Sequence, residues 1–172
     1  QVPPALAPIQ AVVTMVRDEG DVRSTAQQLV GQLIERGVRT RLDDRVDVGF
    51  GRRATDWELK GIPVRVEIGP RDLANGNLTV VRRDTGDKAP VAVSGALDAV
   101  VSSLDQVQRA MYSAAAERLS AATVEVDTVA DALAAAASGF ARMRWDALGD
   151  TGEDELAKSA VTVRCVQRAD GT

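Results

Sequence analysis

The sequence has 172 residues, 45% hydrophobic and only 3% aromatic, which suits one domain with a small appendage and a core of Val, Leu, Ile and Ala. It has no histidine and a single cysteine, Cys165, which excludes Ser-His-Asp and Cys-His catalysis, His-ligated metals, internal disulfides and multi-cysteine zinc sites. The net charge of −4 is unevenly spread: residues 36–88 carry 12 basic and 9 acidic groups, residues 89–172 carry 7 and 12, and any polyanion should therefore bind the middle third.

Strand and helix patterns alternate at the start of the chain. Residues 9–16 form a short apolar run rich in β-branched side chains, which predicts a buried strand. Residues 22–34 repeat apolar side chains at helical spacing before Gly37, which predicts a helix that ends there. Residues 38–43 predict a second strand. A strand–helix–strand unit of this length usually has parallel strands.

The middle of the chain predicts more strands around short turns. Residues 52–60 predict a short helix, and residues 62–68 predict a strand whose apolar side chains, Ile62 included, share one face while Arg65 and Glu67 point to the other. The remaining predicted elements of this part are strands at 78–83 and 91–93 around a turn at 84–87, and a long helix from 97 to about 119.

The composition changes after residue 123 and predicts a small second unit. An Ala-rich helix is expected at residues 129–137, followed by segments at 140–145, 149–155 and 161–166, the last of them strand-like. The predicted fold class is therefore α/β, a mixed β-sheet flanked by helices with a small C-terminal α/β domain. We assign residues 1–122 to the first domain and residues 123–172 to the second.

The hexapeptide from Gly49 to Ala54 fits the pattern G-x-G-x-x-A of dinucleotide-binding loops. Such a loop should join the first strand directly to its helix, but that junction, residues 18–21, is acidic and would repel a pyrophosphate. We therefore favour a plain loop-to-helix turn in which Arg52 and Arg53 are available as phosphate contacts.

Several other residues have simple structural interpretations. Asp43 and Asp44 are neighbours on an extended segment and point to opposite faces, which favours a local ion-pair cluster with the flanking arginines over a catalytic pair. The strand-like surroundings of Cys165 favour a small core residue. Trp57 and Trp145 are expected in the core by default, although stacking on a base is the alternative.

Residues 56–88 contain the most informative polar set. Arg65 lies on the non-core face of its strand, Glu58 ends the preceding helix, Arg71 follows a Gly-Pro corner, and Lys88 ends a turn. Arg donors match O6 and N7 of guanine, a carboxylate accepts from the guanine N1–H and N2–H₂ edge, and an unpaired RNA loop exposes both edges. The alternative is a surface ion pair of Arg65 with Glu58 or Glu67, which contributes little energy. The residues alone leave both interpretations open.

Six short motifs carry a resemblance to a known family. They are LAPIQ at 6–10, RLDDR at 41–45, WELKGIP at 57–63, EIGPRDL at 67–73, RRDTG at 82–86 and TVRCV at 162–166. In this order they resemble the C-terminal part of the prolyl-tRNA synthetase family, of the type shared by eukaryotes, archaea and some bacteria. The resemblance covers nearly the whole chain.

The resemblance implies a class II synthetase anticodon-binding domain that reads the two guanines ending the proline anticodon. Glu58, Arg65, Arg71 and Lys88 match the anticodon-contacting positions of the family. Two departures stand out: Arg71 occupies a position where relatives can carry Lys, which changes the geometry of the cation, and the turn before Lys88 differs in length between relatives.

The resemblance also implies what this chain lacks. The family's catalytic domain, which binds ATP with Mg²⁺ and proline, lies N-terminal to LAPIQ, so we expect the chain to be an inactive fragment with no cofactor or catalytic residue of its own. Expected partners are proline tRNA and the enzyme's own catalytic domain, in a cytoplasmic homodimer away from membranes. Relatives often hold zinc with four C-terminal cysteines, whereas Cys165 matches the TVRCV motif, so no metal is expected.

Two alternatives stay open beside this interpretation. A free-standing RNA-binding or regulatory module with the same fold would need no catalytic partner. A nucleotide-binding regulatory domain would depend on the Gly49 loop.

Overall fold

The structure, a computed structural model, describes residues 2–166 and separates into two compact units that meet between Tyr112 and Ser113. The predicted domain boundary after residue 122 lies further along the chain and stays a prediction, and residues 1 and 167–172 of the two predicted domains lie outside the described part.

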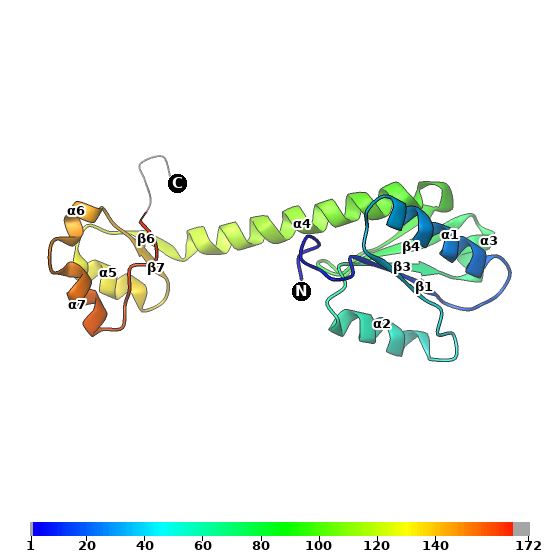
Figure 1. Cartoon of the computed structure of the whole chain (residues 1–172), viewed down its shortest axis with the longest axis horizontal. Helices are drawn as coiled ribbons and strands as arrows, with labels where there is room; N and C mark the ends of the chain where they lie inside the picture. Colours follow the sequence, from blue (N-terminus) through cyan, green and yellow to red (C-terminus); the bar gives the residue numbers. More distant parts are fainter. Residues whose placement is uncertain (1, 167–172) are drawn as a thin grey trace. The chain divides into compact units, whose positions relative to one another are not determined.

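The first unit contains most of the regular structure (Figure 1). Its elements are β1 (Ala11–Met15), α1 (Val22–Glu35), β2 (Thr40–Asp43), α2 (Phe50–Leu59), β3 (Val64–Ile68), α3 (Pro70–Ala74), β4 (Asn77–Arg82), β5 (Lys88–Ala92), a 3₁₀ turn η1 (Val93–Gly95) and α4 (Ala96–Ala121), which continues past Tyr112. Helix α3 was not predicted, and Lys88 begins β5 instead of ending the preceding turn.

Five strands form one mixed sheet in the order β2-β1-β3-β4-β5. Strand β1 is parallel to β2, as the strand–helix–strand pattern predicted, and also to β3. Strand β4 is antiparallel to β3 and β5. The predicted fold class, a mixed sheet flanked by helices, is confirmed.

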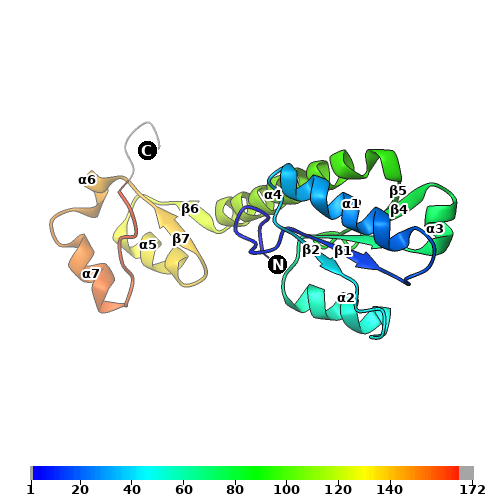
Figure 2. The same cartoon turned by 45° about the vertical axis from the view of Figure 1, so that its right-hand side comes forward.

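Helices α1 and α4 cover one face of this sheet, and α2 covers part of the other (Figures 1 and 2). The face under α1 and α4 contains the main core, in which Val13, Val66 and Val80 pack against Leu29 of α1 and Val100 of α4. This is the usual two-layer solution, in which helices bury the apolar face of a sheet.

The opposite face, called here the second face, has a smaller apolar cluster. Val12 packs there with Trp57 of α2 and with Ile62. The prediction that Ile62 shares a face with Val64 and Val66 is therefore wrong. Strand β3 begins only at Val64, so the residue at the corner before it is free to turn toward α2.

The second unit is small. It contains β6 (Thr123–Glu125) parallel to β7 (Phe140–Arg142), with α5 (Val129–Ala136), α6 (Trp145–Leu148) and α7 (Gly152–Lys158). Its core is built around Ala132, Leu148 and Leu156. The Thr128 hydroxyl caps α5 by accepting from the Asp131 N–H at 3.1 Å, which satisfies an otherwise unpaired donor.

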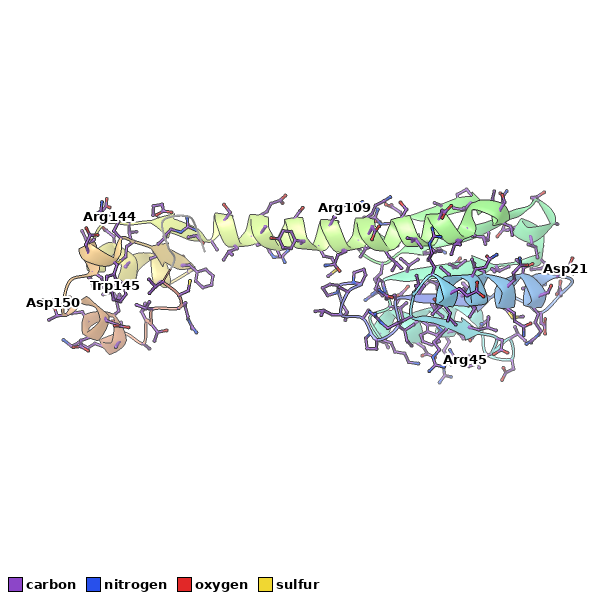
Figure 3. All side chains as sticks on the ribbon, turned by 45° about the horizontal axis from the view of Figure 1, so that its top comes forward. Asp21, Arg45, Arg109, Arg144, Trp145 and Asp150 are labelled. Carbon is purple, nitrogen blue, oxygen red and sulfur yellow. The ribbon has the colours of Figure 1, made fainter. Side chains whose placement is uncertain are left out.

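Three expectations for the second unit are wrong. Residues 161–166 form no strand, and Cys165 is exposed instead of buried. Trp145 is 59% exposed at the start of the four-residue helix α6, next to Arg144 (Figure 3). Along residues 2–166 we find no helix with both the length and the apolar character that crossing a membrane requires.

Candidate functional site

The corner between α2 and β3 fixes where Glu58 lies relative to Arg65. Helix α2 ends in a Schellman motif: the Gly61 N–H donates to the Glu58 carbonyl at 3.0 Å, and the Ile62 N–H donates to the Trp57 carbonyl at 3.3 Å. Gly61 has φ +76°, a conformation that costs glycine little. Packing of Ile62 on Trp57 completes the motif, so the chain returns tightly into β3.

Cross-strand pairing places the basic residues in one row on the second face. Arg65 of β3 is in register with Val81 of β4, and Val81 is in register with Lys88 of β5. Because side chains at paired positions point to the same face, Arg65 and Lys88 flank Val81. The prediction that Arg65 points away from the Val64 and Val66 face is confirmed.

Carboxylates connect these cations. Arg65 donates from Nη1 to Glu58 Oε1 at 3.1 Å and from Nε to Glu67 Oε1 at 3.0 Å. Lys88 Nζ lies 3.3 Å from both oxygens of Glu67. The Arg65 and Glu67 side chains are only 10% and 11% exposed, whereas Glu58 and Lys88 are 45% and 55% exposed. The buried pair therefore forms the floor of the site and the other two side chains form its rim.

A surface pocket lies over this cluster. Its lining comes from α2, the following corner, β3, β4 and the turn into β5, and consists of Trp57, Glu58, Ile62, Arg65, Val81, Arg82, Arg83, Gly86 and Lys88. The structure thus brings together three of the four predicted contact residues, Glu58, Arg65 and Lys88. Gly86 lies in the turn at residues 84–87, just before Lys88. Its φ of +77° would be strained for a residue with a side chain.

The fourth predicted residue, Arg71, lies outside the pocket lining. It is exposed in the first turn of α3, beyond the carboxyl end of β3, and its backbone carbonyl accepts from the Asn75 amide at 3.0 Å. Its predicted role in RNA contact remains a prediction.

The two arginines of the Gly49 loop differ sharply. Arg52 is exposed, but Arg53 is fully buried: its Nη2 donates to the Met15 carbonyl at 2.8 Å and its Nε to the Val48 carbonyl at 3.0 Å. The prediction that Arg53 is available to phosphate is therefore wrong, since its guanidinium satisfies carbonyls at the end of β1 and in the loop before α2.

Arg53 belongs to a buried polar cluster beside the site. Asp43 accepts from Trp57 Nε1 at 2.6 Å and from Arg45 at 2.9–3.0 Å, and its Oδ1 lies 3.4 Å from Arg53 Nη1. Burial alone would raise the pKa of Asp43, but the hydrogen bonds from Arg45 and Trp57 outweigh it and lower this pKa to about 2. The predicted local ion-pair cluster is confirmed for Asp43, whereas Asp44 instead pairs with Arg23 at 3.1 Å.

A second ion pair stiffens the turn between β4 and β5. Arg82 donates to both oxygens of Asp84, at 2.6 and 3.1 Å, and these hydrogen bonds lower the pKa of Asp84. The Arg82 N–H closes the turn on the Asp87 carbonyl at 3.0 Å. These hydrogen bonds therefore fix the start of the turn that leads to Lys88.

The sequence did not point to Arg83 as part of the site. Its Nη1 lies 3.9 Å from Glu58 Oε2 and it lines the same pocket. Glu67 was considered only as an ion-pair partner. The signal available was the RRDTG motif, which places Arg83 at the turn, but only the hairpin register shows that this turn faces α2.

Other kinds of site have less support. Gly49 is the N-cap residue of α2 and follows β2, so the loop does not join β1 to its helix as a dinucleotide fingerprint should. Between residues 2 and 166, no group of three or more Cys, Asp or Glu side chains is arranged to hold a metal ion. The expectation of a zinc-free chain stays a prediction for elemental analysis.

Comparison with known proteins gives consistent results. The family model described as "Anticodon binding domain" matches residues 10–104, which include every residue of the pocket. The proline–tRNA ligase of Frankia casuarinae is 50% identical over 171 residues, covering 99% of this chain and 36% of that protein. The proline–tRNA ligase of Thermococcus kodakarensis is 37% identical over 135 residues, covering 77% of this chain and 28% of that protein.

A solved structure shares the fold. Prolyl-tRNA synthetase from Cryptosporidium parvum, solved with halofuginone and AMPPNP, superposes with a TM-score of 0.82 at 24% identity and covers 92% of this chain and 33% of that one. The chain spans about a third of the length of three curated relatives that it matches over 99–100% of its own length.

Proposed function

Because the chain belongs to the anticodon-binding domain family and corresponds to the anticodon-binding region of prolyl-tRNA synthetases, we propose that it binds the anticodon loop of proline tRNA as part of a proline–tRNA ligase. The observation that carries the proposal is the pocket in which Glu58, Arg65 and Lys88 converge from α2, β3 and β5. These residues come from sequence positions 30 apart and meet only in the folded domain.

The pocket offers both hydrogen-bonding characters that guanine requires. An arginine has five N–H donors, and the contacts of Arg65 with Glu58 and Glu67 occupy its Nε and one N–H on each terminal nitrogen. Two N–H groups are left for O6 and N7 of a base. Glu58 is 45% exposed and supplies a carboxylate acceptor for the N1–H and N2–H₂ edge.

Two cations of the pocket lining, Lys88 and Arg83, supply positive charge for the RNA backbone. Lys88 is 55% exposed and Arg83 lines the pocket beside Glu58. A lysine ammonium acts as a point charge, so it suits a phosphate or a carbonyl oxygen better than a bidentate base contact. We therefore assign Lys88 and Arg83 to holding the loop, Arg65 and Glu58 to reading guanine, and exposed Arg71 and Arg52 to flanking phosphates.

We assign the chemistry of proline attachment, with its ATP and Mg²⁺, to another domain of the same enzyme, in keeping with the third of the relatives' length that this chain spans. The 172-residue chain incubated with ATP, Mg²⁺, proline and proline tRNA should form neither prolyl-adenylate nor charged tRNA. Appreciable product would contradict this division of roles.

The decisive experiment is binding of the chain to two anticodon stem-loops, one with the proline anticodon and one with an anticodon guanine changed to adenine. The wild-type chain should prefer the guanine RNA. Replacement of Arg65 by Ala removes a bidentate donor and should cost about 1–3 kcal/mol against guanine and much less against adenine. Arg142→Ala, which breaks an exposed Arg142–Glu125 pair in the second unit, is the matched control.

Three outcomes separate the possibilities. Equal weakening of both RNAs by Arg65→Ala would make Arg65 a backbone contact, because phosphate contacts carry no sequence information. No preference by the wild-type chain would contradict base reading altogether. Preference of the isolated chain for the guanine RNA fits both a ligase fragment and a free-standing module. If the same organism also encodes its proline–tRNA ligase in a separate gene, that preference would favour the free-standing module.

A further inference from the structure

The Glu67 carboxylate lies beneath two cations of the proposed RNA site. It follows Arg65 by two residues on β3 and therefore shares its face of the sheet. Arg65 Nε and Nη2 both lie 3.0 Å from Glu67 Oε1, and Lys88 Nζ lies 3.3 Å from both carboxylate oxygens. One acidic side chain thus contacts cations from two strands that are separated by β4.

Burial of the Glu67 carboxylate would cost free energy if the two cations were absent. The residue is 9% exposed, and an ionised carboxylate taken out of water is strongly disfavoured unless it is paired and hydrogen-bonded. Its register partner on β1, Thr14, has a buried hydroxyl with no hydrogen-bond partner within the described chain, so it does not compensate Glu67. Arg65 and Lys88 therefore offset the cost of burying Glu67, and Glu67 in turn fixes the positions of these two cations.

The edge of Arg65 that Glu67 contacts decides which edge faces the pocket. Nε and Nη2 lie on the same side of the planar guanidinium, and both approach the same oxygen of Glu67. Contact along that side leaves the second N–H of Nη2 and, besides the N–H that donates to Glu58, one N–H of Nη1 for another partner. A fixed plane of this kind is what bidentate base recognition requires.

We propose that Glu67 is a positioning residue that orients Arg65 and tethers Lys88, so that the two cations meet RNA as one preorganised pair. The proposal rests on the proposed function, because it assigns the cations to RNA. Glu67 is not part of the pocket lining and would act through Arg65 and Lys88, which are.

If Glu67 acted only through its negative charge, its removal would raise RNA affinity instead of lowering it. A carboxylate beside an RNA site repels phosphates, so removal of its charge should strengthen binding of every RNA alike. Loss of positioning should instead weaken the guanine RNA and spare the adenine RNA. Glu67→Gln separates the two views, because the amide keeps the size of the side chain but has no charge and turns an NH₂ toward a cation.

The test measures affinities of the 172-residue chain for the guanine and adenine stem-loops, with thermal unfolding of each variant alongside. Glu67→Gln should lower affinity for the guanine RNA about tenfold and lower the guanine-to-adenine preference by a similar factor. In the Arg65→Ala background the same change should have little further effect on preference, since the positioned group is gone. Glu125→Gln, which removes an exposed carboxylate paired with Arg142, should change neither RNA.

Glu67→Asp covers the case in which the Gln variant fails to fold. It keeps the charge but withdraws it by one methylene, so its melting temperature should stay close to wild type while its guanine preference falls partway. A lower melting temperature with unchanged preference would make Glu67 purely structural, and stronger binding of both RNAs would make it a repulsive charge; each result overturns the proposal. If the wild-type chain shows no guanine preference, the proposed function fails and the positioning role fails with it.

Discussion

The indole N–H of Trp57 donates to Oδ2 of Asp43 at 2.6 Å and joins α2 to β2 on the second face. The same indole packs with Val12 and Ile62, and Lys60 Nζ lies 4.3 Å from its ring centroid. Because Glu58 follows Trp57 on α2, this hydrogen bond helps to set where the Glu58 carboxylate meets Arg65. Asp43 thus acts on the site through the placement of a helix.

Asp43 should make stability depend on acid pH. Its folded-state pKa is lowered to about 2, below the value of about 3.9 for an unfolded chain, so the folded state favours the ionised form. The resulting stabilisation is complete above about pH 4 and is lost as the pH falls toward 2, with a magnitude of about 2 kcal/mol. Urea unfolding of wild type and Asp43→Asn at several pH values measures it as a difference that shrinks below pH 4.

The control for this measurement is Asp146→Asn. Asp146 also pairs with a neighbouring arginine, Arg144, but both side chains are exposed, so the change should leave unfolding unaltered. A difference between wild type and Asp43→Asn that is constant from pH 7 to pH 2 would show that the Asp43 charge does not contribute.

Local patterns predicted the sheet because they determine it directly. The apolar run around Val13, the alternation around Arg65 and the turn at Asp84 each specify a strand or a reversal over a few residues, and each is present. The same alternation correctly put Arg65 opposite the main core. The meeting of Arg65 with Lys88 needed the register of the β4–β5 hairpin, which the sequence did not supply.

Residues whose environment depends on distant parts of the chain were predicted less well. Arg53 is buried because its guanidinium donates to the carbonyls of Val48, in the preceding loop, and of Met15, on a distant strand. No local sequence pattern predicts this. Trp145 was expected inside because of its residue type and Cys165 because of its strand-like surroundings, but the buried core of the second unit, Ala132, Leu148 and Leu156, includes neither. Residue type alone is a weak guide in so small a unit.

The same substitution should affect stability much more at Arg53 than at Arg52. Arg53→Gln removes a buried guanidinium that donates to three carbonyls and faces the Asp43 carboxylate, and should lower the free energy of unfolding by about 3 kcal/mol. Arg52→Gln changes an exposed side chain and should alter stability by less than about 0.5 kcal/mol. Denaturant unfolding of the two neighbouring variants tests this; equal stability of both would contradict the buried role of Arg53.

The salt dependence of RNA binding should map the phosphate contacts. Each contact with single-stranded RNA contributes a slope of about 0.7 in a plot of log affinity against log salt concentration. Arg71→Glu and Arg52→Glu should each reduce the slope, because both side chains are exposed in the basic middle third of the sequence. Arg109→Glu, on the exposed surface of α4 (Figure 3), should leave it unchanged, and equal effects from both sets would make the charge asymmetry incidental.

Glu58→Gln should weaken guanine recognition without unfolding the domain. Glu58 is 45% exposed and contacts Arg65 at 3.1 Å, so its removal affects a rim ion pair of small energetic value. An amide oxygen is a poorer acceptor than a carboxylate for the N1–H and N2–H₂ edge, and its NH₂ would face those donors. We expect affinity for the guanine stem-loop to fall by about 1–2 kcal/mol with the melting temperature nearly unchanged.

The partner base distinguishes direct contact from an effect through Arg65. Inosine lacks the N2 amino group of guanine but keeps N1–H, O6 and N7, so it removes one donor to Glu58 and leaves the acceptors for Arg65 intact. If Glu58 accepts from N2–H₂, replacing guanine by inosine should weaken wild type but add little to Glu58→Gln, whereas Arg65→Ala should retain the inosine penalty. Additive penalties for Glu58→Gln and inosine would show that Glu58 does not accept from the N2 amino group, which leaves it a contact with N1–H or a role in holding Arg65.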